Sequence, residues 1–196
     1  FYSNTNIPVL NAQVWITDNL NNRYDFYDNS QNGNYVATNF VMDLNNFYTL
    51  NILVDTELYQ ATANFFNTPN IDEVEQNPNG GFSGEDLEIK IWHNDNIATA
   101  NYYQLIENST NYPEYKLSSD EFYNGNRNSF LIFDDELESG DSFEVVLSEV
   151  SREYYEYMNR ILSVSQNSGN PFASPIGEIR GHILNVTNPE NYPLVY

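Results

Sequence analysis

Apolar and polar residues alternate with a period of two through the first third of the chain. Segments with this pattern are separated by short runs of Asn, Asp and Gly, the residues that favour turns. The alternating segments are 12–17, 23–27, 35–40, 48–54 and 58–63. Five short strands without a helical pattern between them predict an antiparallel meander or β-sandwich of immunoglobulin or transthyretin type over residues 1–66.

The alternation stops at residues 67–84, where Pro, Gly and Asn become dense. A short apolar stretch at 71–74 is the one strand candidate in this region. Such a composition is typical of a linker or a long loop between domains. We therefore expect residues 67–84 to join two separate parts of the chain.

A second series of strand-like segments follows the predicted linker. It comprises residues 87–92, 102–106, 129–133 and 143–147. In the first of these, Leu87, Ile89 and Ile91 share one face and Trp92 lies on the other. We expect Trp92 on the more exposed face of its strand. In the first part Trp15 falls between Val14 and Ile16, so alternation allows either Trp15 or these two residues to face inward, and we favour burial of Trp15 because of its size.

One helix is predicted, from Arg152 to about Gln166. Ser151 is a suitable N-cap, and Gly169 with Pro171 ends the pattern. Apolar residues recur at steps of three and four: Tyr154, Tyr157, Met158, Ile161, Leu162 and Val164. This stripe predicts that the helix packs on the sheet formed by the second series of strands. The sequence thus predicts a mainly β protein with two antiparallel β-sandwich-like parts, 1–66 and 85–196, and one α-helix packed on the second.

The charge balance limits the partners of the chain. It has 28 acidic and 7 basic residues, which give a formal net charge of -21. Such a charge repels nucleic acids and anionic lipid headgroups, so we predict that the chain binds neither. There is no Cys, and no apolar run approaches the length that spans a bilayer. We expect a soluble segment, with any signal peptide or lipid anchor upstream of Phe1.

Candidate catalytic and metal-binding patterns are few. The two histidines, His93 and His182, have no partner at the local spacing of a zinc site. No nucleophile elbow, phosphate-binding loop or dinucleotide-binding pattern is present, so we predict no enzyme activity and no cofactor. Asp134, Asp135 and Asp141 lie in an acidic stretch. This stretch is either a solvated turn or a Ca²⁺ site, since hard cations take several oxygen ligands.

Aromatic residues provide the remaining binding candidates, with 16 Tyr, 12 Phe and 2 Trp in the chain. Tyr112, Tyr115 and Tyr123 lie in a loop-rich stretch between residues 108 and 127, and Trp92 is expected on an exposed face. Tyr and Trp combine a large apolar face with a polar tip, which suits contact with a sugar or a protein. Packing in a core is the alternative for each of them.

A series of short motifs resembles one known family in its order along almost the whole chain. The motifs are Ala12-Gln13-Val14-Trp15-Ile16-Thr17-Asp18, Gly33-Asn34-Tyr35, Tyr48-Thr49-Leu50-Asn51-Ile52, Tyr59-Gln60-Ala61, Pro69-Asn70-Ile71-Asp72, Asn101-Tyr102-Tyr103, Gly140-Asp141, residues 151–157 and Asn170-Pro171-Phe172. The family is a group of outer-membrane surface lipoproteins of Bacteroidetes, known as domain-of-unknown-function family 4249. Its members are usually encoded beside TonB-dependent receptors.

The resemblance implies a lipid-anchored protein on the cell surface, attached to the outer membrane through an anchor upstream of this segment. It also implies a TonB-dependent receptor or transporter as partner and a role in nutrient uptake. Our hypothesis is a non-enzymatic component that captures a substrate or binds this partner. The alternative is a structural or adhesive surface module that binds protein or glycan, and an acid-pair hydrolase is the least favoured class.

Overall fold

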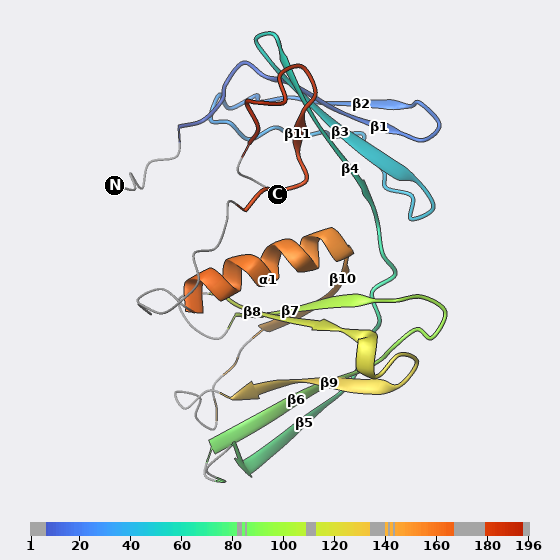
Figure 1. Cartoon of the computed structure of the whole chain (residues 1–196), viewed down its shortest axis with the longest axis vertical. Helices are drawn as coiled ribbons and strands as arrows, with labels where there is room; N and C mark the ends of the chain where they lie inside the picture. The colour runs from blue at the N-terminus through green and yellow to red at the C-terminus, as the bar shows by residue number, and fades with distance from the viewer. Residues whose placement is uncertain are drawn as a thin grey trace. The chain divides into compact units, whose positions relative to one another are not determined.

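A computed structural model describes residues 7–81, 84, 86–108, 113–133, 140, 142, 144–166 and 179–193. Within these residues the protein is mainly β, with three antiparallel sheets and one α-helix (Figure 1). The predicted mainly β class, with antiparallel sheets and one α-helix, is confirmed. The chain forms two compact units, of which unit 1 combines Phe1–Phe65 with Gly177–Tyr196 and unit 2 is Phe66–Ile176.

Unit 1 contains a five-stranded antiparallel sheet in the order β11-β4-β3-β1-β2. The strands are β1 (Gln13–Asp18), β2 (Arg23–Phe26), β3 (Phe47–Val54), β4 (Glu57–Asn64) and β11 (Leu184–Asn185). The strand predicted over 35–40 is wrong, because this segment contributes only an isolated bridge between Tyr27 and Val36. The two residues at this bridge exchange backbone hydrogen bonds, and the rest of the segment is a loop.

Aromatic rings cover one face of the unit 1 sheet. Phe40, from the loop after β2, contacts Tyr24 and Tyr48 with ring centroids 5.0 and 5.3 Å apart. Phe65 continues the row, with its ring centroid 5.4 Å from that of Tyr48. These edge-to-face contacts provide an apolar cover where no second sheet is present in the described part of unit 1.

Trp15 lies on the opposite, polar face of this sheet and is only half-buried. Its strand partner is Asn51, and the guanidinium carbon of Arg23 lies 4.2 Å from the centre of the indole ring. Its neighbour Ile16 instead faces the apolar side, beside Leu50. The prediction that Trp15 is buried was therefore wrong, since the alternation of the strand directs Ile16 inward.

Unit 2 is a sandwich of two three-stranded sheets, with orders β5-β6-β9 and β10-β7-β8. The strands are β5 (Ile71–Gly80), β6 (Asp86–Asn94), β7 (Tyr102–Asn108), β8 (Glu114–Ser119), β9 (Arg127–Phe133) and β10 (Glu144–Val150). Between the sheets lies a core in which each side chain is at most 6% exposed: Ile89, Ile91, Tyr103, Leu105, Phe130 and Ile132. The predicted inward face of Ile89 and Ile91 is confirmed.

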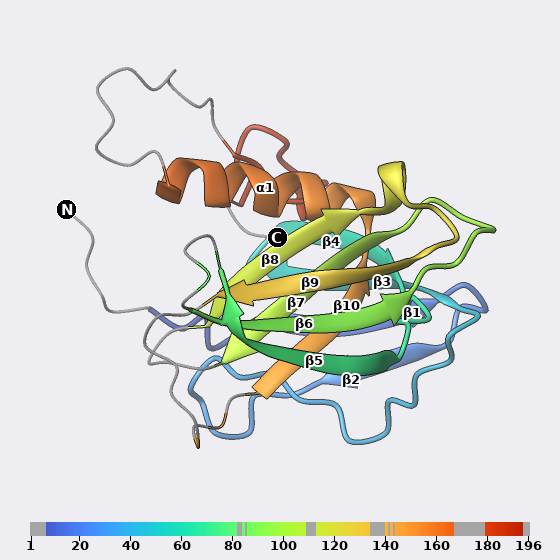
Figure 2. The same cartoon turned by 90° about the horizontal axis from the view of Figure 1, so that it is seen from below.

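The helix α1 (Arg152–Gln166) lies on the outer side of the β10-β7-β8 sheet, as predicted (Figure 2). The Tyr154 amide donates to Oγ of Ser151 at 3.1 Å, which caps the first turn. The Tyr154 hydroxyl donates to Oε1 of Gln104 on β7 at 2.6 Å. These contacts fix the start of the helix over the middle strand of the sheet. Among the described residues, no helix has the length and apolar composition needed to cross a membrane.

The predicted linker over 67–84 and the second part over 85–196 both differ from the structure. Residues 71–80 form β5, which pairs with β6. The register of this pairing shifts near both ends of β5, between Ile71 and Glu73 and between Asn77 and Gly80. Pro78 is tolerated because β5 is an edge strand and the register shifts between Asn77 and Gly80. At the other end, Leu184 and Asn185 pair with β4, so the end of the chain belongs to unit 1.

A candidate binding groove in unit 2

An open groove of about 480 Å³ lies where four elements of unit 2 converge. These elements are the start of β7, the end of β8, the 3₁₀ helix η1 (Asp120–Phe122) and the first turns of α1. Its lining residues are Ala100, Tyr102, Ser119, Asp120, Glu121, Asn124, Arg152, Tyr155 and Glu156. A groove of this volume has the size of a small-molecule or side-chain binding site.

Strand register brings these distant segments together. Tyr102 at the start of β7 pairs with Ser119 at the end of β8, and the chain enters η1 directly afterwards. On the other side, Tyr102 pairs with Val150 of β10, and α1 begins two residues later. The groove therefore forms at one end of the β10-β7-β8 sheet, on the face that carries the helix.

Two tyrosines form an aromatic wall of the groove. The rings of Tyr102 and Tyr155 are tilted by 43° with centroids 5.0 Å apart, and both side chains are half-buried. Neither hydroxyl has a hydrogen-bond partner among the described residues. The wall thus offers apolar ring faces together with two hydroxyl groups that are available for hydrogen bonds to a ligand.

The floor of the groove is acidic. Asp120 is 4% exposed, and its Oδ2 accepts the backbone amide of Asn101 at 2.8 Å. The Asn101 side-chain amide donates to Oε1 of Glu149 at 2.7 Å. Burial raises the pKa of Glu149; the bond from Asn101 opposes this rise, and the charges of Asp95 and Asp120 add to it. A group of carboxylates is thus concentrated behind the groove.

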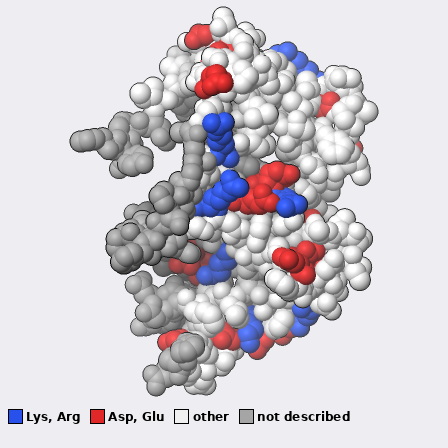
Figure 3. All heavy atoms as spheres, in the orientation of Figure 1, with Lys and Arg blue, Asp and Glu red and all other residues white. Residues whose placement is uncertain are grey.

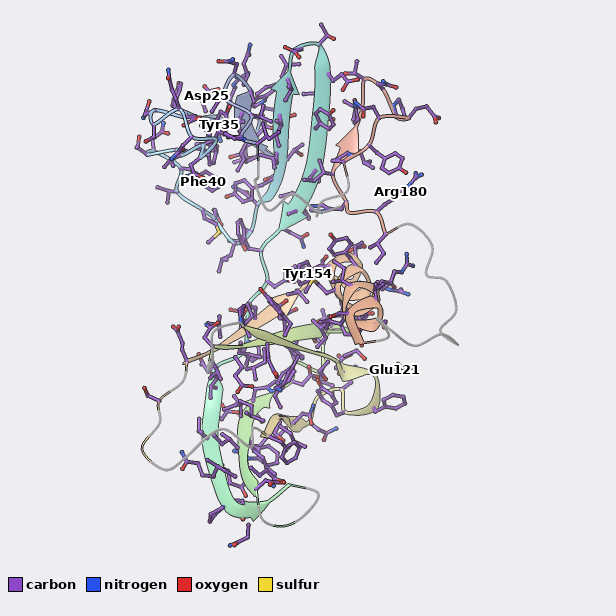
Figure 4. The ribbon with its side chains drawn as sticks, turned by 90° about the vertical axis from the view of Figure 1, so that its left-hand side faces the viewer. Asp25, Tyr35, Phe40, Glu121, Tyr154 and Arg180 are labelled. Atoms are coloured by element: carbon purple, nitrogen blue, oxygen red, sulfur yellow. The ribbon has the colours of Figure 1, made fainter. Side chains whose placement is uncertain are left out.

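The rim carries one basic and two acidic side chains. Glu121 lies exposed on η1 (Figure 4) and has no hydrogen-bond or ion-pair partner among the described residues. Arg152 and Glu156 form an ion pair along α1, with Nε and Oε1 2.8 Å apart. The lining therefore holds three carboxylates and one guanidinium. Figure 3 shows that, on the face it presents, charged side chains occur in small groups between wide uncharged areas.

Hydrogen bonds to Asp95 hold the loop beside the groove. Its Oδ1 accepts the hydroxyl of the buried Tyr103 at 2.5 Å, and its Oδ2 accepts the amide of Gly125 at 2.6 Å. Gly125 has φ +76°, and a Cβ at this position would lie 2.7 Å from Cβ of Ile97. Glycine is needed here for both reasons, so the loop has a fixed shape.

The predicted binding residues do not form one site. Trp92 lies on the outer face of the β5-β6-β9 sheet, where its Nε1 donates to Oε2 of Glu75 at 3.0 Å. Tyr115 is 37% exposed and lies on β8, four residues before the groove-lining Ser119. Tyr112 lies outside the described residues. The expectation that Trp92 faces away from the core is confirmed, because its neighbour Ile91 is buried.

Tyr123 was a binding candidate with packing in a core as the alternative, and the structure shows the packing. It is half-buried and packs against the core, and its hydroxyl and Oγ of Ser118 are 2.9 Å apart. Burial raises its pKa. The turn after η1 directs the ring inward, because the Tyr123 amide donates to the Asp120 carbonyl at 2.8 Å.

The predicted Ca²⁺ residues, Asp134, Asp135 and Asp141, lie outside the described residues. Among the residues that are described, no three acidic or histidine side chains are grouped as metal ligands. His93 is 0% exposed in the core, stacked on Phe130 with ring centroids 5.7 Å apart. Burial lowers its pKa, and within the described part of the chain neither ring nitrogen has a hydrogen-bond partner.

A second, apolar cleft of about 220 Å³ lies in unit 1. It is lined by Ile16, Phe40, Tyr48, Leu50, Ala61, Ala63, Phe65, His182 and Ile183. It therefore joins the ring-covered face of the sheet to the chain segment before β11. With few polar groups to orient a ligand, this cleft is less specific in its chemistry than the groove of unit 2.

Sequence reasoning did not identify the residues that line the groove. Tyr102, Asp120, Glu121, Arg152 and Tyr155 come from separate segments, and no local spacing connects them. One signal was present, since two motifs of the family resemblance, Asn101-Tyr102-Tyr103 and 151–157, border the groove.

A family described as "Domain of unknown function (DUF4249)" matches residues 1–193, nearly the full length of the chain. Comparisons with curated proteins and with solved structures gave no match.

Proposed function

We propose that this chain, which belongs to the DUF4249 family of unknown function, is a non-enzymatic binding component at the cell surface. In this proposal it captures a ligand, or presents it to a TonB-dependent outer-membrane transporter. The outer-membrane location, the lipid anchor upstream of Phe1 and the transporter are supported by the order of family motifs along the chain. The groove of unit 2 is the proposed contact site.

The groove is the observation that carries this proposal. It combines an aromatic wall, a nearly buried carboxylate and charged side chains on an exposed rim. Such a combination orients a ligand through ring contacts and a few fixed polar groups. Its floor is held by hydrogen bonds of Asn101 to Asp120 and Glu149, so the site is preformed.

The surroundings of the histidine and carboxylates support a non-enzymatic role. His93 is buried in the core without a hydroxyl or carboxylate hydrogen-bonded to its ring, so it is unsuited to act as a general base. Asp120 and Glu149 are both engaged by Asn101, which makes them part of the framework of the groove.

A second candidate is a structural or adhesive contact made by the outer face of the β5-β6-β9 sheet. Leu131 is 42% exposed and Phe133 49% exposed on β9, and both share the outer face with Trp92. Exposed apolar side chains on a flat sheet favour contact with another protein. This face is distinct from the groove, so the two candidates are separable by mutation.

The test is affinity purification of the tagged protein from native membranes, combined with growth under conditions in which the gene is required. We expect a β-barrel transporter to co-purify, and Tyr155→Ala to impair growth. Tyr27→Ala is the matched control, since Tyr27 is an exposed tyrosine of unit 1 outside the groove. Loss of growth with Leu131→Asp but not with Tyr155→Ala would favour the adhesive face. Turnover of a glycan or peptide by the pure protein would contradict the non-enzymatic role.

A further inference from the structure

We infer that the groove of unit 2 binds an organic cation, an amine or guanidinium group on a flexible or aromatic body. This inference rests on the proposed function and names the chemical class of its ligand. It is based on the buried carboxylate of the floor, the aromatic wall and the charge balance of the rim.

Asp120 provides the anionic contact. The residue is 4% exposed, yet it lines the groove. Its Oδ2 is engaged by Asn101, and Oδ1 has no hydrogen-bond partner among the described residues. Oδ1 is not fully buried, so a ligand can reach it, and a charged donor forms the strongest hydrogen bond with a carboxylate oxygen.

The charge of the groove favours the same class of ligand. Asp120, Glu121 and Glu156 outnumber Arg152, and the Nε of Arg152 is already engaged by Glu156. Glu149 lies behind the floor, joined to Asp120 through Asn101. An anionic ligand is repelled by this group of carboxylates. The net charge of -21 of the chain also raises the local concentration of cations at low salt.

The tyrosine wall distinguishes an organic cation from a metal ion. The rings of Tyr102 and Tyr155 present apolar faces, and no three acidic or histidine side chains among the described residues are grouped as ligands for a metal ion. An ammonium or guanidinium group, in contrast, is attracted by the face of an aromatic ring and carries carbon atoms that pack against it. The groove thus supplies a carboxylate for the charge and rings for the body of the ligand.

Binding of four probes to the full chain by calorimetry at low salt tests this inference. The cationic probes are spermidine and the capped tripeptide acetyl-Gly-Lys-Gly-amide. The same peptide with acetylated Lys is the neutral probe, and the peptide with Glu in place of Lys is the acidic one. We expect the cations to bind at least tenfold more tightly than the other two, with affinity that falls as salt is added. Tighter binding of the peptide indicates a protein side chain as the source of the cation, and tighter binding of spermidine indicates a free polyamine.

Three variants connect binding to the groove. Asp120→Asn is expected to weaken cation binding about tenfold or more and Tyr155→Ala about fivefold, while Glu121→Gln weakens it about threefold. Glu121 is exposed, so its variant remains informative if Asp120→Asn fails to fold. Glu144→Gln, the same charge change at an exposed position of β10 outside the groove, is the control and leaves binding unchanged.

The possible failures separate this inference from the proposed function. Cation binding that is absent, or lost equally in Glu144→Gln, overturns the inference. If the neutral or acidic probe binds and Tyr155→Ala abolishes that binding, the groove remains a binding site and only the cation assignment is wrong. If no probe binds and Tyr155→Ala also leaves growth unchanged, both proposals are wrong.

Discussion

The two units protect their apolar side chains from water in different ways. In unit 2 a second sheet closes over the first, and the six core side chains are at most 6% exposed. In unit 1 a loop and a row of rings cover a single sheet, and among its described residues only Tyr48 and Ala61 are apolar and buried. A second sheet excludes water from an apolar face more completely than a loop does. Unit 2 therefore has the better-buried core, and it holds the groove.

The buried polar groups differ in the same way. In unit 1, Asp18 accepts the amides of Leu20 and Asn22 at 2.9 and 2.8 Å, which shapes the turn between β1 and β2. In unit 2, Asn101 holds the two carboxylates beneath the groove. Buried polar residues thus stabilise a turn in one unit and a binding surface in the other.

The largest expected effect comes from truncating the unit 2 core. Ile91→Ala removes a side chain that is 0% exposed, so we expect the free energy of unfolding to fall by about 3 to 4 kcal/mol. Ile16→Ala, at a half-buried position of unit 1, is the matched change and is expected to lower it by about 1 to 2 kcal/mol. Urea unfolding measures both. Equal losses of unfolding free energy in the two variants would show that the apolar faces of the two units are equally well protected from water.

Asn185→Ala tests whether the end of the chain is part of unit 1. Asn185 is 2% exposed; its amide donates to the Asn191 carbonyl at 2.8 Å, and its Oδ1 accepts the amides of Thr187 and Asn188. We expect a loss of about 2 kcal/mol, because several hydrogen bonds of a buried group are removed. Amide hydrogen exchange should increase in β4 and remain unchanged in β6. Faster exchange in β6 instead would contradict the assignment of this segment.

The buried histidine of unit 2 predicts a dependence of stability on pH. Burial lowers the pKa of His93 in the folded protein, while Asp95 and Asp72 act against this shift. Below the unfolded pKa of about 6.5 the unfolded chain binds more protons than the folded one, so stability is lost as pH falls. His93→Phe is expected to stabilise the protein by about 1 kcal/mol at pH 7, since two unpartnered nitrogens are removed.

Comparing His93→Phe with the unchanged protein isolates the contribution of His93 to the pH dependence of stability. Both proteins contain the same titrating carboxylates, so the contribution of the carboxylates cancels. The difference in unfolding free energy should widen from pH 7.5 to pH 5.5, by up to about 1.4 kcal/mol for each pH unit below 6.5. Urea unfolding at the two pH values measures it. A difference that stays constant would mean that His93 is not kept neutral by the fold.

The smallest effect is expected on the outer face of unit 2. The guanidinium carbon of Arg127 lies 4.6 Å from the centre of the Trp92 ring, and Arg127 also forms an ion pair with Glu73. Both contacts are exposed, so Arg127→Ala should lower the unfolding free energy by less than about 1 kcal/mol. Thermal unfolding at low and high salt measures the loss. A loss as large as that of Ile91→Ala would make this face part of the core.

The sequence alone determined those features that depend on neighbours along the chain. Alternation predicted most strands and the inward face of Ile89 and Ile91, and steps of three and four predicted α1. Trp92 was placed correctly because its strand is buried on one side only. Trp15 was misplaced because alternation left two inward sets open and the size of the indole was used to choose between them.

Only the tertiary structure decided the features that depend on partners distant in sequence. The polar segment 71–80 is a strand because β6 pairs with it, and the two residues of β11 join unit 1 because β4 pairs with them. In the same way, the groove exists because strand pairing brings Tyr102, Asp120 and Tyr155 together from three segments. Periodicity reports how each segment divides its own faces, whereas pairing depends on the hydrogen bonds and packing available from the rest of the chain.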